Sequence, residues 1–155
     1  MIRIILRLSL CLLLLPGCDR QSAAPASGLA IVDMKLGSRS YALEIAAKSM
    51  DRNKGLMYRD SMPADHGMIF IFAKPADQSF WMHNTRIPLD IVYLDERGKV
   101  VSIHRMEPYV EQGTMSKAPA MYAVELNAGE AQKAGVKEGD ALQVPEAARG
   151  VIADP

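Results

Sequence analysis

The sequence predicts an α+β fold that is mainly β, formed by a single compact domain of about seven strands with two short helices. The chain has 155 residues, which allows one domain. Short apolar or alternating runs recur between turn residues, as is typical of strands. No internal period of 20–50 residues is visible, which excludes solenoids and propellers. We expect the strands to form a partly closed, barrel-like sheet.

The first elements of the domain are a predicted hairpin and a predicted helix. Residues 29–36 are mostly apolar and residues 41–46 mix polar and apolar side chains, which is consistent with two strands joined by a turn. Residues 49–58 predict a short helix, because Ser49 can cap it and an acidic residue follows in the first turn. Gly55 weakens the interior of this helix, so the pattern leaves its end open.

The centre of the domain is predicted to contain four more strands. Residues 68–73 are apolar on both faces, which indicates a strand inside the fold, and residues 79–83 form the next strand. Residues 89–94 and 99–106 are separated by residues 95–98 (DERG), where Asp and Gly occupy the favoured ends of a type I turn. These two strands therefore form a second hairpin.

The last part of the domain begins with a polar segment. Residues 107–120 contain two prolines and a glycine and predict a long loop. Residues 121–126 predict a strand, residues 130–134 a short helix that ends at a glycine, and residues 141–144 a final strand. The folded domain is therefore expected to end near residue 149.

The N-terminus predicts export. Arg3 and Arg7 precede an apolar run at residues 8–15, and small residues follow it. A basic start, a short apolar stretch and a small residue before the cleavage point are typical of a secretory signal. The run is shorter than the ~20 residues that a membrane-spanning helix needs. We expect residues 1–17 to be removed as a signal peptide.

The end of this signal, Leu15-Pro16-Gly17-Cys18, resembles the lipobox of bacterial lipoproteins. The resemblance implies that Cys18 becomes the first mature residue and carries acyl chains such as palmitate, and two or more chains hold a protein firmly at a membrane. Asp19 implies retention at the inner membrane. We therefore expect a protein anchored by lipid and facing the periplasm. The alternative is an ordinary signal peptide in which Cys18 is incidental.

Lipidation would also decide the thiol chemistry of the mature chain. Cleavage removes Cys11 and lipidation consumes Cys18, the second of two cysteines. A disulfide, a thiolate zinc site and a cysteine nucleophile are then excluded. Residues 18–28 form the lipidated start and a flexible tether, residues 29–149 the globular domain, and residues 150–155 a C-terminal tail.

Charge and known motifs narrow the function further. The 18 basic and 18 acidic side chains give a formal net charge of +0, which argues against a nucleic-acid partner. The sequence contains no metalloprotease HExxH, no GxSxG elbow and no phosphate loop, so hydrolysis by a known motif has no support. We predict no cofactor.

Three groups of segments together resemble the bacterial and archaeal domain of unknown function 192 family. They are RNKGLM and GMIF at residues 52–57 and 67–70, FWMHNT and IPLDI at 80–85 and 87–91, and the stretches at 122–129 and 135–140. The resemblance covers roughly residues 31–144. It implies a small, single-domain protein that is often exported or lipid-anchored, and it brings no agreed activity, cofactor or substrate. The polar positions on the family's motifs are Arg52, Arg59, Asn84, Thr85, Asp90, Glu125 and Asp140.

The segment FWMHNTRIPLD contains the best candidate for a functional site. Asp90 falls in a predicted strand, and a buried carboxylate needs donors because an unpaired charge there is costly. Asn84 and Thr85 could supply donors and Arg59 could pair with Asp90. These side chains would form a pocket for a small anionic or hydroxylated ligand, with Asp90 as a possible general base. The alternative is that Asp90 and Thr85 only hold the turn at Pro88.

Two aromatic side chains complete the predicted pocket. Trp81 is read as core or pocket wall rather than as a platform for sugars, and His83 follows closely. The full predicted pocket is Arg59, Trp81, His83, Asn84, Thr85 and Asp90.

A Cu(I) site is a further alternative, because the chain has 10 methionines and thioethers with imidazole suit that ion. Met82 and His83 would be its nucleus, with Met57 or Met68 nearby. Adjacent residues on a strand point to opposite sides, however, so we place no metal there.

These observations favour a non-enzymatic accessory module of the cell envelope that binds a small ligand or an envelope protein. The rival hypothesis is a small enzyme that uses Asp90 with His83 or Arg59 on an envelope-derived substrate. A third reading is a periplasmic Cu(I)-binding protein.

Overall fold

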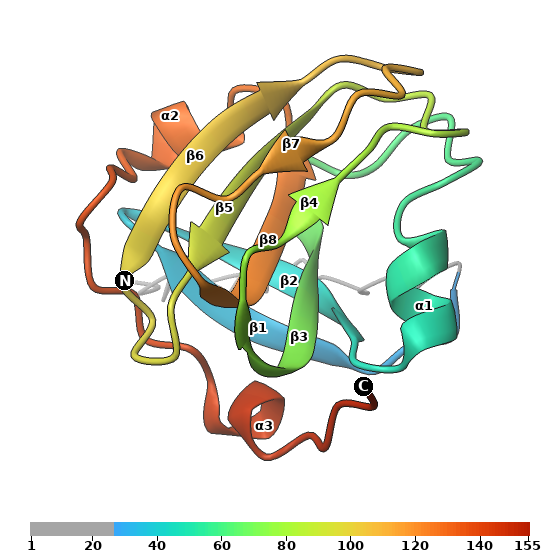
Figure 1. Cartoon of the computed structure of the whole chain (residues 1–155). Coiled ribbons are helices and arrows are strands. Elements are labelled where there is room, and N and C mark those ends of the chain that lie inside the picture. Colours follow the sequence, from blue (N-terminus) through green and yellow to red (C-terminus); the bar gives the residue numbers. More distant parts are fainter. Residues whose placement is uncertain (1–26) are drawn as a thin grey trace, which may run out of the picture.

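The computed structural model describes residues 27–155 (Figure 1). The predicted signal peptide at residues 1–17, the lipidated Cys18 and most of the tether lie outside the described residues. No helix within residues 27–155 is both long and apolar enough to cross a bilayer. The strands are β1 (Ile31–Leu36), β2 (Arg39–Ala46), β3 (His66–Ala76), β4 (Ser79–Phe80), β5 (Leu89–Leu94), β6 (Val100–Met106), β7 (Thr114–Met115) and β8 (Ala120–Asn127), and the helices are α1 (Ser49–Lys54), α2 (Glu130–Ala134) and α3 (Glu146–Arg149).

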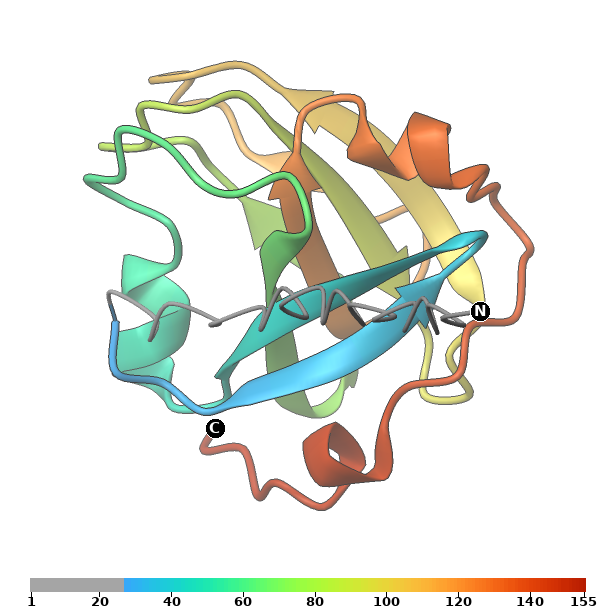
Figure 2. The same ribbon diagram turned by 180° about the vertical axis from the view of Figure 1, so that it is seen from behind.

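A six-stranded sheet forms the body of the domain, in the order β1-β2-β3-β8-β5-β6. All neighbours are antiparallel except β2 and β3, which are parallel. A parallel pair needs a crossover connection, which here is the segment that contains α1. Strands β4 and β7 form a separate two-stranded ribbon. Seen from behind, β1 and β2 run across the other strands (Figure 2).

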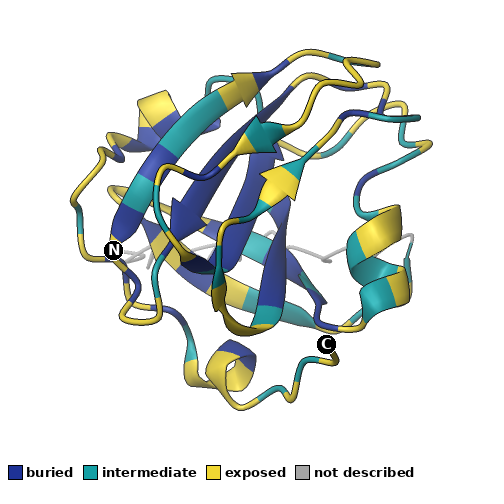
Figure 3. Ribbon diagram, viewed as in Figure 1, coloured by how far each residue is buried: buried dark blue, intermediate teal, exposed yellow. Residues whose placement is uncertain are grey.

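The sheet has a hydrophobic core on each face. On β3, Ile69 and Ile71 belong to the first core, and Met68 and Phe70 belong to the second, as expected from the alternation of side chains along a strand. Residues of α2 and α3 close the first core. Residues of the α1 crossover and of the segment after β4 close the second, which includes Leu56, Met82 and Ile87. The central strands β5 and β8 are buried along most of their length (Figure 3).

Several predictions of the elements are confirmed. The fold is mainly β, with the first hairpin at β1 and β2 and the second at β5 and β6. Asp95 holds the second turn because its Oδ1 accepts hydrogen bonds from the backbone N–H groups of Arg97 and Lys99, both at 2.8 Å. Helix α2 has the predicted bounds.

Other predictions are wrong in their extent. The sheet is not closed into a barrel, because β1 and β6 are its two ends and do not pair. Residues 27–155 contain eight strands, one of which, β7, lies in the predicted loop at residues 107–120, and they contain a third helix, α3, which the sequence did not predict. The strand predicted at residues 79–83 ends at Phe80. Residues 141–144 form only the bridge from Ala141 to Lys99.

Helix α1 is shorter than predicted. It ends at Lys54 because Gly55 adopts a φ of 46°, a conformation that glycine tolerates and that stops the helix. Ser49 does not cap it, since Lys48 occupies the N-cap position. Instead, Asp154 Oδ1 accepts the hydrogen bond of the Ser49 N–H at 2.5 Å.

Candidate functional site

Two glutamates lie in one row across the sheet, on the face of the second core. Glu44 of β2 is adjacent to Met68 of β3, and Glu125 of β8 is adjacent to Met68 on its other side. Two strand spacings, roughly 10 Å, therefore separate the glutamate backbones. Both residues are buried, with exposed fractions of 3% and 4%. A buried carboxylate must be paired or must take up a proton, and these two differ in this respect.

Glu44 is a paired carboxylate. The Arg59 guanidinium donates to both of its oxygens, from Nη1 to Oε1 at 2.6 Å and from Nη2 to Oε2 at 2.8 Å. The Ser27 hydroxyl also donates to Oε2. Burial alone would raise the pKa of Glu44, but the hydrogen bonds from Arg59 and Ser27 outweigh it and leave the pKa below its ordinary value. Glu44 is therefore charged and anchors Arg59 to the sheet.

Glu125 has no such partner. Within residues 27–155, no group lies at hydrogen-bonding distance from its carboxyl oxygens. Burial raises the pKa of Glu125 to about 8, and the positive charge of Arg59 opposes this rise only in part. At neutral pH the side chain is therefore a neutral carboxylic acid, which can donate one hydrogen bond and accept others.

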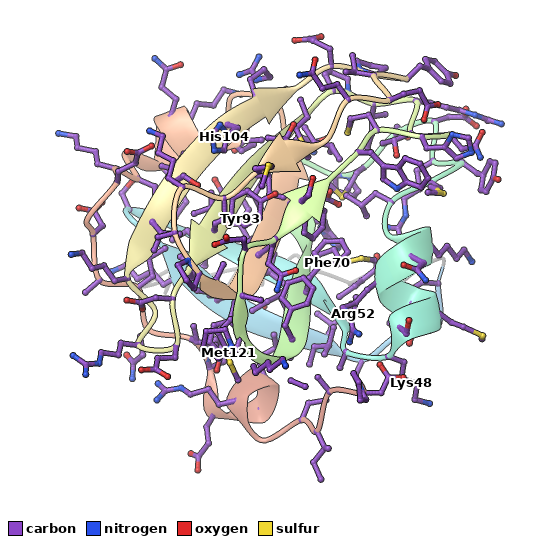
Figure 4. All side chains as sticks on the ribbon, viewed as in Figure 1. Lys48, Arg52, Phe70, Tyr93, His104 and Met121 are labelled. Atoms are coloured by element: carbon purple, nitrogen blue, oxygen red, sulfur yellow. The ribbon has the colours of Figure 1, made fainter. Side chains whose placement is uncertain are left out.

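Glu125 lines a small pocket on this face of the sheet. The pocket has a volume of about 30 Å³, enough for one or two water molecules or a small substituent of a ligand. Its wall is formed by the end of α1 and the residues after it, by the two rings Phe70 and Phe80, and by Trp81 and Thr85. Arg52 and Phe70, both labelled in Figure 4, belong to this wall.

The Arg52 guanidinium is already used within the fold. It donates to the carbonyl oxygens of Ala47, Ile71 and Asp154, and it pairs with the Asp154 carboxylate at 3.2 Å. It also lies 5.4 Å from the centre of the Phe72 ring. Arg52 therefore holds the crossover in place and offers little to a ligand. The other polar residues of the wall are Glu125, Thr85 and the exposed Asn53 and Lys54.

The structure divides the pocket predicted from the sequence. Trp81 and Thr85 line the Glu125 pocket, and Trp81 is half exposed, so it is pocket wall and not core. His83 and Asn84 belong to the same loop. Arg59 binds Glu44 and not Asp90. The Thr85 hydroxyl donates to the His83 carbonyl at 3.3 Å and the Asn84 amide donates to the Tyr58 hydroxyl at 2.9 Å, so neither is a donor to Asp90.

Asp90 lies on the opposite face of the sheet. Its register neighbour on β8 is Leu126, a residue of the first core. Its Oδ1 accepts from Arg105 Nε at 2.7 Å, and its Oδ2 accepts from the backbone N–H groups of Gly129 and Ala131 at 2.8 and 3.1 Å. Asp90 therefore fixes the start of α2 and holds neither the pocket nor the Pro88 turn.

The residues proposed for copper are also separated. Met82 is buried in the second core, whereas the His83 ring is partly exposed and its Nδ1 is 2.8 Å from Glu111 Oε1. Across residues 27–155, no group of three or more His, Cys, Asp or Glu side chains is placed to hold a metal ion.

Glu125 falls on a family motif but is not among the pocket residues predicted from the sequence. The signal was present, because MYAVEL puts one acidic residue in an otherwise apolar strand. Like Asp90, Glu125 is an acidic side chain in an apolar strand and needs a donor when it is buried. Only the structure shows that Asp90 finds donors and Glu125 does not.

Residues 31–144 match the family model of domain of unknown function 192, DUF192, described as an uncharacterised ACR family. The chain belongs to this family. The match covers nearly the whole of the folded domain, including both glutamates and the full wall of the pocket, and it confirms the resemblance read from the sequence.

Two solved structures are similar to this DUF192 chain. A putative transcription regulator from Sinorhizobium meliloti is 35% identical, with a TM-score of 0.71, over 74% of this chain and 94% of that one. A protein of unknown function from Novosphingobium aromaticivorans is 34% identical, with a TM-score of 0.71, over 77% of this chain and 89% of that one. No curated protein gives a significant match.

Proposed function

We propose that this protein is a binding module that receives a small, neutral, hydroxyl- or amide-bearing group in the Glu125 pocket. The observation that carries the proposal is a buried carboxyl group without a hydrogen-bond partner among residues 27–155, on the wall of a pocket. The Glu125 oxygens are not among the fully enclosed polar atoms without a partner in residues 27–155, so they open onto the pocket. Buried polar groups are nearly always hydrogen-bonded, and a ligand in the pocket can supply the partner that the protein does not.

The protonation of Glu125 selects the chemistry of the ligand. A neutral carboxylic acid donates and accepts at the same time, and a hydroxyl or a primary amide does the same in return. Phe70 and Phe80 supply apolar walls around these groups. Of the two basic residues on the pocket wall, Arg52 is held by the crossover and Lys54 is exposed to solvent, which screens its charge.

The proposal is tested by NMR titration with glycerol and acetamide as neutral probes, and with acetate and methylammonium as charged controls of similar size. We expect the two neutral probes to shift the amide signals of residues 54–57, 80–85 and 125 at neutral pH. Glu125→Gln should keep this response, because an amide also donates and accepts, and Glu125→Leu should abolish it. Equal shifts in the Glu125→Leu variant, or none in the wild type, would contradict the proposal.

Acid–base catalysis at the same pocket is the second candidate. Two carboxyl groups whose pKa values move apart are the pattern from which an acid and a base are assigned in many enzymes, and Glu44 and Glu125 follow it. Asp90, the base suggested by the sequence, is used by Arg105 and α2. Against catalysis, Glu44 is held by Arg59 and is not part of the pocket wall. A Glu125→Gln variant that binds a substrate but has lost its turnover would favour the enzyme.

We also propose that the module works in the cell envelope, exported and held by lipid on Cys18 at the periplasmic face of the inner membrane. The support is the signal-like start and the lipobox-like residues before Cys18. The short tether then keeps the pocket close to the membrane surface. A small envelope ligand or an envelope protein would be its partner there.

A further inference from the structure

Three large aromatic side chains are exposed on loops near the pocket. Tyr58, Trp81 and Tyr109 have exposed fractions of 57%, 53% and 61%, and we call them the aromatic rim. Large aromatic rings are costly to leave in water, and Trp and Tyr are enriched where one molecule contacts another. The rim is therefore a candidate contact surface.

Hydrogen bonds join the three loops of the rim into one surface. The Tyr58 N–H donates to the Asn84 carbonyl at 2.9 Å, and the Asn84 amide donates to the Tyr58 hydroxyl at 2.9 Å. The Tyr109 N–H donates to the Thr85 carbonyl at 3.3 Å. Trp81 is in the same loop as Asn84 and Thr85, so the rim and the pocket wall are continuous.

The backbone of the rim is strained. Within residues 27–155, the non-glycine residues with positive φ are Tyr58, Asn84 and Tyr109, at 65°, 53° and 62°. Each such conformation costs of the order of 1–3 kcal/mol and persists only where surrounding contacts enforce it, and such residues gather at binding sites. All three belong to the rim loops, so the conformation of this surface lowers the stability of the fold and must be enforced by its surroundings.

Trp81 is the part of the rim that borders the pocket. Its indole stacks on the His83 ring, with the ring centres 5.0 Å apart and the planes 24° from parallel. His83 is held in turn by Glu111. The stack covers one face of the indole, and Trp81 stays about half exposed beside the pocket that it lines.

The ionisable side chains around the rim carry no surplus of positive charge. Arg86 pairs with Asp60 at 2.6 Å, and His83 contacts Glu111 at 2.8 Å. A phosphate-rich partner needs a surplus of basic groups, which these pairs do not provide. A partner that matches the rim has an apolar face for the rings and hydroxyl or amide groups for the pocket.

We propose that the rim binds a saccharide, with one pyranose ring stacked on Trp81 and one ring substituent, a hydroxymethyl group, inserted beside Glu125. A pyranose combines an apolar face of C–H groups with a ring of hydroxyls, which is the combination that the rim and the pocket require. This inference rests on the proposed function, because it names the ligand class of the same pocket.

Trp81 is the one tryptophan of the chain, so its fluorescence reports this contact directly. The test titrates the full protein with tri-N-acetylchitotriose and with cellotriose and follows the fluorescence and the amide signals of residues 58, 81–85 and 109. We expect a saturable change in both. Trp81→Ala should bind at least tenfold more weakly by NMR, while Trp81→Phe, which keeps a ring, stays within about threefold.

Matched variants separate the rim from general effects on the surface. Tyr109→Ala should weaken binding, and Met50→Ala, which removes an exposed side chain on α1 outside the rim, should not. If Trp81→Ala folds and binds the saccharides as tightly as the wild type, the inference is wrong. If both saccharides fail to bind while glycerol and acetamide still enter the pocket, the inference falls and the proposed function stands. If the small probes also fail, the proposed function falls too.

Discussion

Glu44 and Glu125 share a residue type, a face of the sheet and nearly complete burial, yet their pKa values move in opposite directions. The difference lies in the donors, since Arg59 and Ser27 serve Glu44 and nothing in residues 27–155 serves Glu125. The sequence shows that an acidic residue within an apolar strand needs a donor. It does not show which donor the fold delivers, and the expected pairing of Arg59 with Asp90 is wrong for that reason.

Glu125 should make the stability of the protein depend on pH. Its pKa rises from 4.5 in the unfolded chain to about 8 in the folded one, so the folded state holds the proton more tightly. Its stabilising contribution is complete below pH 4.5 and is lost as the pH rises through about 8, a change of the order of several kcal/mol. Urea unfolding of the wild type should show this loss between pH 5 and 9, and Glu125→Gln should not. A wild type whose stability rises over this range would contradict the assignment.

Arg59 should matter for stability because Glu44 is buried and its charge needs a partner. Arg59→Met leaves a buried carboxylate with only the Ser27 hydroxyl and should cost about 3 kcal/mol of unfolding free energy. Arg86→Met is the matched control, since its partner Asp60 is exposed and such pairs contribute about 0–1 kcal/mol. Equal losses in the two variants would show that the Arg59–Glu44 pair has no special role.

Elements that depend on their own local sequence were predicted better than elements that depend on pairing with a distant segment. The hairpin of β5 and β6 follows from residues 95–98 alone, and α2 from its own composition and its closing glycine. The two-residue strands β4 and β7 exist only because they pair with each other, and nothing in either segment indicates this. The strand predicted at residues 79–83 stops at Phe80, which frees Trp81 to reach the surface.

The start of α2 depends on Asp90, a residue on another element. Asp90→Ala removes the acceptor of two backbone N–H groups and of Arg105, and should cost about 2–4 kcal/mol. Hydrogen exchange should speed up in α2, while the folded variant should bind glycerol in the Glu125 pocket as the wild type does. Loss of that binding in the folded variant would place Asp90 in the site after all.

At the scale of the whole molecule, the two faces of the sheet have different roles. The first face is closed by α2 and α3, and the second is closed by loops that carry the pocket and the aromatic rim. Short apolar and alternating runs predicted a mainly β domain, but they did not predict that β2 and β3 run parallel or that the sheet stays open. Both depend on the path of the α1 crossover, which no local pattern encodes.

Anchoring is tested on the whole chain in a bacterial host. Cys18→Ser should move the protein from the membrane fraction to the soluble fraction, and mass spectrometry of the wild type should find acyl chains on residue 18. Cys11→Ser is the control, because it changes the other cysteine and leaves the acceptor intact. A wild-type product with a free thiol at residue 18 would contradict the lipid anchor.

The central claim is that Glu125 is a neutral acid at the wall of its pocket at neutral pH. A ¹³C NMR titration of the Glu125 side-chain carboxyl carbon, assigned with the Glu125→Gln variant, tests this claim most directly. We predict a midpoint near pH 8, because the carboxyl group is buried and has no hydrogen-bond partner in residues 27–155. A midpoint near 4.5 would mean that the group is charged and solvated, and it would contradict the account.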